Sequence, residues 1–145
     1  MKRITLLIAL TFIFGNISLT SYAKKRTTSI NSRFIKAIEH GDVKKVRRLL
    51  ASGANVNTRG SGKTTPLIIS SNNGYIEIVK MLLAHKADID AVNIDGENAL
   101  MLTSSGMLFG KKEKIHFQIA ELLVKRGIKL ETKNKKGGIK KLLIY

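Results

Sequence analysis

The sequence has no cysteine, no tryptophan, a single proline and few acidic residues. Without cysteine the chain cannot form disulfides, thiolate metal sites or a cysteine nucleophile. Lys and Arg number 26 against 10 Asp and Glu, which gives a net charge of +16. This surplus bears on solubility and on attraction to anionic partners, and it says nothing about fold. Apolar residues make up 43% of the 145 residues, enough for the core of one small domain.

The first 23 residues have the layout of an export signal. A short basic start, MKR, precedes an apolar run over residues 4–14, and the segment ends in Ser21-Tyr22-Ala23. Small residues at the −3 and −1 positions predict a secretory signal peptide cleaved after Ala23. An uncleaved membrane anchor is the alternative, but a spanning helix needs roughly 20 apolar residues and this run is much shorter. We expect residues 1–23 to direct export to a bacterial periplasm or out of the cell.

The chain beyond residue 23 repeats itself. Residues 32–57 align without a gap with residues 65–90, at an offset of 33. The matched pairs include Gly41 and Gly74, Val46 and Val79, Leu49-Leu50 and Leu82-Leu83, and Ala54 and Ala87. A regular period of this length is typical of proteins that stack small units around a shared core.

A third copy follows with an insertion. It starts at Asn98, again 33 residues after Thr65, but its second half, residues 117–131, matches the second copy at an offset of 41. The difference, 41 − 33, places about eight extra residues around 107–114. Loops accept insertions at a small thermodynamic cost, so we expect a longer loop between the two halves of this copy.

Each copy has the signals of two short helices. In the second copy, Thr65 is a good N-cap and Pro66 suits the first helical position. Asn73-Gly74 predicts the end of this helix, since glycine accepts the left-handed conformation common at helix C-termini. The next segment has apolar residues at helical spacing, namely Ile76, Val79, Leu82 and Leu83.

These residues resemble the ankyrin repeat family, whose pattern runs TPLH, then G-x-x-E-[IV]-V-x-x-LL, then GA-[DN]-[VI]-[DN]. The second copy carries Thr65-Pro66-Leu67, Gly74, Glu77-Ile78-Val79, Leu82-Leu83 and Ala87-Asp88-Ile89-Asp90. The resemblance implies an all-α solenoid of helix-turn-helix-loop units, with repeats at about 31–60, 61–93 and 94–134. Residues 135–145 are expected to begin a fourth copy as a partial C-terminal capping helix.

The sequence departs from the family pattern at three places. Ile68 occupies the position of a histidine that joins adjacent repeats by hydrogen bonds in the family, and Ser70 and Ser71 replace two alanines. Asn98-Ala99 replaces Thr-Pro at the start of the third copy. We expect these changes to loosen the stack and to leave the fold unchanged.

A nucleotide-binding interpretation of the stretch RGSGKTTPL, residues 59–67, fails on context. A phosphate-binding loop requires the pattern G-x-x-x-x-G-K-[ST] between a strand and a helix. Its first glycine would fall at residue 57, which is Asn57, and no buried strand pattern precedes it. Lys63 is therefore predicted to lie in a loop between repeats and not to contact a bound phosphate.

No catalytic or metal-binding arrangement is evident. The three histidines, His40, His85 and His116, fall in different copies without the spacing of metal ligands, so we expect exposed polar side chains. Asp88 and Asp90 recur as Asn55 and Asn57, which indicates turn chemistry. We expect no catalytic residues, no cofactor, no metal and no small-molecule substrate.

The resemblance implies a non-catalytic module that binds another protein through the concave face of the stack, as a monomer. The expected partner-binding residues are Arg59, Ser61, Lys63, Thr64, Asn72, Asn73, Ile94, Asp95, Glu97 and Ser105. The insertion could carry a function of its own, and its candidate residues are Met107, Leu108, Phe109, Lys111 and Lys112.

An electrostatic function is the alternative. Basic residues cluster at residues 24–26, on the second helix of copy one and in the tail at 133–141. On that helix Lys44, Lys45, Arg47 and Arg48 are expected on the outer, convex face, opposite the apolar residues. Such a face could bind an anionic surface such as phospholipid, polysaccharide or nucleic acid, or it could simply be solvated.

Cleavage of the signal peptide gives the first testable prediction. Mass spectrometry of the protein from its native host should find a chain that begins at Lys24. Intact Met1 in the membrane fraction would instead identify residues 1–23 as an anchor.

Overall fold

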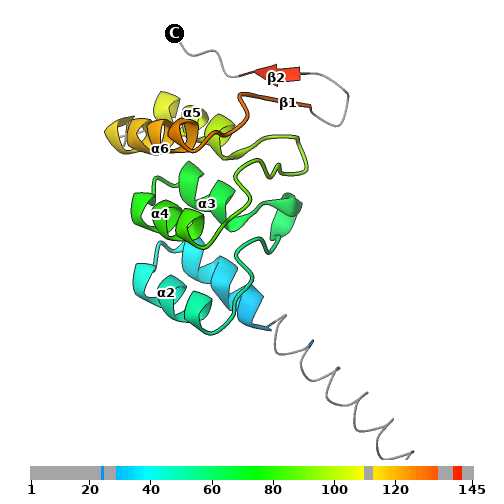
Figure 1. The fold of residues 1–145 in the computed structure, drawn as a ribbon, viewed down its shortest axis with the longest axis vertical. Coiled ribbons are helices and arrows are strands. Elements are labelled where there is room, and N and C mark those ends of the chain that lie inside the picture. Colours follow the sequence, from blue (N-terminus) through cyan, green and yellow to red (C-terminus); the bar gives the residue numbers. More distant parts are fainter. Residues whose placement is uncertain (1–23, 25–28, 110–112, 134–138, 142–145) are drawn as a thin grey trace, which may run out of the picture.

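The computed structural model describes residues 24, 29–109, 113–133 and 139–141; the expected signal peptide lies outside this part. Three helix pairs stack in a row, with the first helix of each pair in one column and the second in another (Figure 1). The pairs are a helix over residues 29–39 with α2 (Val43–Ala51), α3 (Pro66–Asn72) with α4 (Ile76–Ala84), and α5 (Ala99–Phe109) with α6 (Glu113–Lys125). A short 3-10 helix, η1 (Ser61–Lys63), lies in the first loop. The all-α repeat architecture is confirmed.

The predicted helix signals are confirmed in copy two. The Thr65 hydroxyl accepts a hydrogen bond from the Ile68 backbone N–H at 3.4 Å, and Pro66 is the first residue of α3. The helix ends before Gly74, whose φ is 74°. Among the described helices, none is long and apolar enough to cross a membrane.

The core lies between the two columns of helices and runs through all three copies. Its largest fully buried side chains are Phe34, Ile38, Val46, Leu67, Ile68, Ile78, Val79, Leu82, Leu100, Ile119 and Leu123. Each helix has only 7 to 13 residues, and helices this short are marginal in water by themselves. Stability therefore comes from packing each pair against its neighbours: α3 contacts both α4 and α5, and α4 contacts both α2 and α6.

The insertion in copy three lengthens helices. α5 has 11 residues where α3 has 7, and α6 has 13 where α4 has 9. The two differences, four residues each, account for the eight extra residues. Four residues make about one helical turn, so each helix keeps its face toward the core while it grows by a turn. The expectation of a longer loop around residues 107–114 is thus wrong at its two ends: Met107, Leu108 and Phe109 are helical, and α6 already begins at Glu113.

The C-terminal prediction needs correction. Strand β1 (Glu131–Lys133) pairs antiparallel with strand β2 (Ile139–Lys141), so residues 139–141 do not begin a capping helix. Ile139 occupies the position at which Thr65 and Asn98 cap the first helices of copies two and three. Isoleucine has no side-chain acceptor for the first helical N–H groups, and its β-branched side chain favours a strand. The rest of the predicted cap lies outside the described residues.

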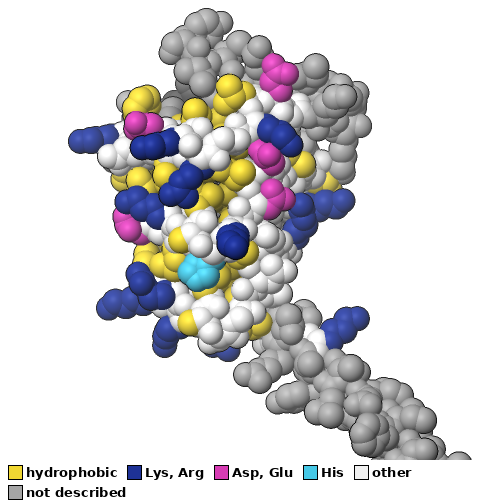
Figure 2. Space-filling view, viewed as in Figure 1, with side chains coloured by type: hydrophobic (Ala, Val, Ile, Leu, Met, Phe, Trp, Pro, Cys, Tyr) yellow, Lys and Arg dark blue, Asp and Glu magenta, His cyan; other side chains and the backbone are white. Residues whose placement is uncertain are grey.

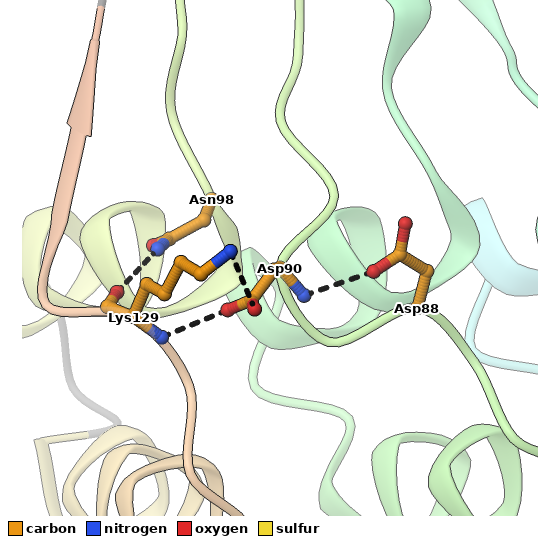
Figure 3. Close-up of polar contacts among 4 residues, drawn as sticks. All are labelled: Asp88, Asp90, Asn98 and Lys129. Carbon is orange, nitrogen blue, oxygen red and sulfur yellow. Dashed lines mark hydrogen bonds and ion pairs between the residues drawn. The ribbon is translucent and has the colours of Figure 1, made fainter.

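Asn98, which replaces the threonine of the family pattern, makes two hydrogen bonds within copy three. Its side-chain oxygen accepts a hydrogen bond from the Met101 N–H at 3.1 Å, which caps α5. Its side-chain amide donates to the Lys129 carbonyl at 2.8 Å. An asparagine can make both bonds at once because it carries a donor and an acceptor, and here it joins the start of α5 to the chain that follows α6 (Figure 3).

A ladder of side-chain acceptors joins successive copies along the loop side of the stack. Asn57 Oδ1 accepts from the Asp88 N–H at 2.8 Å. Asp90 Oδ1 accepts from the Lys129 N–H, also at 2.8 Å (Figure 3). Asn57 and Asp90 are equivalent positions 33 residues apart, so this bond repeats with the copies. Within copy one, Asn31 Oδ1 accepts from the N–H of Asn55, the residue equivalent to Asp88, at 2.9 Å. The recurring Asn and Asp residues also form turns, as predicted, since Asn55 and Asp88 accept from the N–H two residues on.

A second ladder lies on the opposite side, at the turn between the helices of each pair. The Tyr75 hydroxyl donates to the Glu39 carbonyl at 3.5 Å. His116 Nε2 lies 2.9 Å from the Asn72 carbonyl. Tyr75 and His116 are equivalent under the offset of 41, and Glu39 and Asn72 under the offset of 33. In each case a ring just before a second helix or in its first turn contacts the last residue of the preceding copy's first helix.

Ser71 provides a test of the core. Its side-chain oxygen is buried. Among the buried side-chain nitrogen and oxygen atoms of the described residues, it is the one without a hydrogen-bond partner. A buried unpaired hydroxyl costs about 1–3 kcal/mol, so Ser71→Ala should raise the free energy of unfolding by about 1 kcal/mol. Ser70 is the matched control because its hydroxyl donates to the Leu67 carbonyl at 3.2 Å. In urea titrations, Ser71→Ala should be the more stable variant, and the reverse order would contradict this account.

Asp90 provides a test of the loop-side ladder. Asp90→Ala removes the acceptor of the Lys129 N–H and should lower the free energy of unfolding by about 1 kcal/mol, the usual net value of a hydrogen bond. Asp90→Asn should cost clearly less, because Asn57 makes the same bond with an amide oxygen. The exposed loop residue Asp95 serves as the control for the lost charge. If Asp90→Ala and Asp95→Ala are equally stable, the ladder does not stabilise the stack.

Candidate functional site

An open cleft of about 390 Å³ lies between the first helix and the loop that follows α2. The helix contributes Asn31, Ser32, Ile35, Lys36 and Glu39, and the loop contributes Thr58, Arg59 and Gly60. Lys36, Glu39 and Arg59 are exposed, whereas Ile35 is half-buried. The cleft therefore offers an apolar floor with charges of both signs at its rim, on the face formed by loops and first helices.

The loops that border this face are held to one another. Arg59 Nη1 donates to the Lys63 carbonyl and to the Val92 carbonyl, each at 2.9 Å. The Ile94 N–H donates to the Gly62 carbonyl at 2.8 Å. Arg59 thus closes its own loop and joins it to the next. We predicted Arg59 as a partner-binding residue, and the structure gives its side chain this positioning role.

The loop of copy three is organised by Asn93. Its side-chain oxygen accepts from the N–H groups of Asp95 and Glu97, both at 2.9 Å. Its amide donates to the Glu97 carboxylate at 3.0 Å. Asp95 remains exposed at the tip, while Glu97 is half-buried and already bonded within the loop. The sequence prediction included Asp95 and Glu97 and missed Asn93, whose turn-forming residue type was the available signal.

The predicted partner-binding residues fall into two groups. Those before α3 and α5 lie in or beside loop tips that contact each other: Arg59, Ser61 and Lys63 are exposed, and Thr64 and Ile94 are half-buried. Asn72 and Asn73 lie at the opposite end of α3, where the Asn72 carbonyl accepts from His116. The side chain of Ser105 lies outside the described part, as do Lys111 and Lys112. Sequence reasoning missed Ile35, Lys36 and Glu39, because it assigned the first copy no binding residues on its first helix.

Residues 61–63 form a single 3-10 turn in which Lys63 has a φ of 57°. The Lys63 carbonyl accepts from Arg59, and its side chain is exposed. Residues 52–60, which precede the turn, contain no strand. This geometry agrees with the prediction that the stretch GKT is part of a repeat loop.

The histidines differ from the prediction in one case. His40 and His85 are exposed, and each places Nδ1 within 2.9 Å of the carbonyl four residues earlier at a helix end. His116 is only 4% exposed and bonds to Asn72 across the repeat boundary. The expectation of an exposed side chain is therefore wrong for His116. The alignment with Tyr75 carried the signal, since both positions hold a ring that can donate a hydrogen bond.

The positive charge is not concentrated on one element. On α2, Lys44, Arg47 and Arg48 are exposed, as predicted, while Lys45 is half-buried. Figure 2 shows Lys and Arg side chains spread over the visible face from the α2 region to the α6 region, with acidic side chains among them. An anionic surface would therefore meet positive charge spread over this face, and α2 carries the most cations of the described helices, with Lys44, Lys45, Arg47 and Arg48.

Comparison with known proteins agrees with the repeat geometry. A model of ankyrin repeats in three copies matches residues 34–134. The human ankyrin repeat and KH domain-containing protein 1 is 32% identical over 110 residues, which is 76% of this chain and 4% of that protein. The Drosophila melanogaster ankyrin repeat and KH domain-containing protein mask is 34% identical over 110 residues, which is 76% of this chain and 3% of that protein. The bovine ankyrin repeat domain-containing protein 49 is 39% identical over 72 residues, 49% of this chain and 30% of the relative.

The chain spans only a small part of these relatives, so the likeness concerns the repeats and not the activities of the whole proteins. Over the repeats, the family match and the stacked helix pairs agree. The chain belongs to the ankyrin repeat family.

Proposed function

We propose that this protein is an exported, non-catalytic module that binds another protein through the cleft and loop tips of its concave face. Ankyrin repeats in general mediate protein–protein interaction and are not catalytic. The observation that carries the proposal is the cleft between the first helix and residues 58–60. Its half-buried Ile35 lies among exposed charges of both signs, which suits a polypeptide with apolar and charged side chains.

Loop rigidity supports this choice of surface. The Arg59 and Ile94 hydrogen bonds fix adjacent loop tips before a partner arrives. A preformed surface loses less conformational entropy on binding than mobile loops do. The exposed residues Ser61, Lys63 and Asp95 are then available for contact, while Arg59 acts mainly by holding the loops in position.

An electrostatic interaction with an anionic surface is the second candidate, favoured by the three exposed cations of α2. The two functions differ in their response to salt. Binding that depends on counterion release weakens steeply between low and physiological salt, whereas binding in the cleft should depend on its particular side chains. The export signal remains part of the proposal and determines the compartment from which a partner should be sought.

A charge exchange in the cleft tests the proposal without changing the net charge. The double variant Lys36→Glu with Glu39→Lys exchanges two charges on the first helix, and both residues line the cleft. Glu77→Lys with Lys80→Glu is the matched control on α4, where the two exposed residues form an ion pair at 3.0 Å. In pull-downs of the mature protein from its own compartment at physiological salt, the cleft exchange should lose the proteins bound by wild type, and the α4 exchange should retain them.

Two results would contradict the proposal. Equal losses in both variants would point to a general effect of charge arrangement, and retention in both would remove the cleft from the binding site. Circular dichroism of each variant should show unchanged helix content, so that a loss of binding is not a loss of fold.

A further inference from the structure

The end of the stack formed by copy three exposes large apolar side chains. Phe117 and Val124 on α6 are 64% and 43% exposed, and Leu130 after α6 is 40% exposed. Among the described residues, these three are the large hydrophobic side chains that are exposed to solvent. Phe117 and Val124 are seven residues apart, so they lie on the same side of α6, about 10 Å apart along its axis. Hydrophobic side chains reach the surface over the α5–α6 part of Figure 2.

The equivalent positions in the earlier copies are covered. Phe117 corresponds to Ile76 and Val43, Val124 to Leu83 and Leu50, and Leu130 to Ile89 and Val56, under the offsets of 41 and 33. All six of these residues are buried or partly buried and belong to or pack against the core. Val43 lines a small cavity together with Tyr75, Ile76 and Ile78 of copy two, which places it at the boundary between the copies. The three exposed residues of copy three therefore occupy positions that are at least partly buried in the two copies followed by another helix pair.

The charges around this end indicate the chemistry of the occupant. Among side chains described between residues 114 and 132, the exposed cations are Lys114, Lys125, Arg126 and Lys129, and the exposed carboxylates are Glu121 and Glu131. Lys129 is paired with Asp90 at 3.3 Å, so the charge offered to a partner comes from Lys114, Lys125 and Arg126. A second copy would bring the same surplus of cations against it. The chain's own tail is a second occupant to consider. Its four apolar residues, 142–145, follow Lys140 and Lys141 directly. The positive charge of this end would therefore repel a second copy and the basic residues of the chain's own tail. Carboxylates of a partner protein would be attracted to it.

We propose that the end face defined by Phe117, Val124 and Leu130 binds an acidic amphipathic helix of a partner protein. The helix continues the stacking already seen between α2 and α4 and between α4 and α6. Apolar residues at i, i+3, i+4 and i+7 cover Phe117 and Val124. Asp and Glu residues beside this stripe face Lys114 and Lys125. This surface shares no residue with the concave cleft, so the proposal does not depend on which protein the cleft binds.

Fluorescence anisotropy with synthetic helical peptides tests the proposal on the full mature chain. The probe is a labelled peptide of about 18 residues, long enough to form a helix when alanine-rich, with leucines at the stated spacing, glutamates beside this stripe and alanines elsewhere. A peptide with lysine in place of glutamate tests charge, and one with the same composition in scrambled order tests the stripe. We expect the glutamate peptide to bind at physiological salt and the other two to bind at least tenfold more weakly.

Matched variants locate the binding site. Phe117→Ser and Val124→Ser should each weaken binding of the glutamate peptide by about tenfold, as expected for a buried anchor. Both side chains are exposed in the free protein, so folding should be unaffected, which circular dichroism verifies. Lys114→Glu with Lys125→Glu should also weaken binding, whereas Lys44→Glu with Arg47→Glu, the same charge change on α2, should not. The Lys36 and Glu39 exchange should leave this affinity unchanged, which separates the end face from the cleft.

Five results would overturn the proposal. The glutamate peptide fails to bind, or it binds wild type and Phe117→Ser equally. The two double charge variants weaken binding to the same extent, which would indicate non-specific attraction. Sedimentation equilibrium finds a wild-type dimer that Phe117→Ser dissolves, which would assign the face to a second copy. Finally, removal of residues 142–145 raises the peptide affinity tenfold, which would assign the face to the chain's own tail.

Discussion

The structure depends on one constraint: no helix pair in this chain can bury its apolar face alone. Each pair presents one side to its predecessor and the other to its successor, and the core is continuous because Val46, Val79 and their neighbours meet across the copies. Helices of 7 to 13 residues acquire stability only in this arrangement. The constraint explains why the 33-residue period is visible in the sequence, since every copy must present matching faces in the same register.

Two hydrogen-bond ladders fix how the copies meet. On the loop side, Asn57 and Asp90 accept backbone N–H groups of the next copy, and on the turn side Tyr75 and His116 contact carbonyls of the preceding one. Apolar packing alone tolerates small slips between neighbouring pairs, whereas hydrogen bonds require particular atoms at particular distances. With bonds on both edges of the core, the relative rotation of adjacent copies is set, and the loop tips are held in line.

The sequence predicted whatever recurs and failed where a copy departs from the pattern. Helix positions, the cap at Thr65 and the turn role of Asp88 followed from residue type and spacing. The C-terminal strand was missed because the repeat register was extended to Ile139 without asking whether that residue could cap a helix. The insertion was expected to be a loop, yet its two ends lengthen α5 and α6 by a turn each. The cleft residues Lys36 and Glu39 were missed for another reason: their roles depend on contacts between segments, which spacing along the chain does not reveal. His116 was missed because its alignment with Tyr75 was not used.

The same constraint separates structural from functional surfaces. A side chain that faces the next copy is fixed by stacking, and one at a loop tip or on the cleft rim is free of that requirement. Arg59 shows that the division is not simply one of exposure, because an exposed side chain can hold two loops together. Phe117 shows the converse, because it occupies a stacking position that no described residue covers. Comparing equivalent positions between copies separates the two cases: Phe117 is 64% exposed, whereas Val43 and Ile76 at the equivalent positions pack against the core.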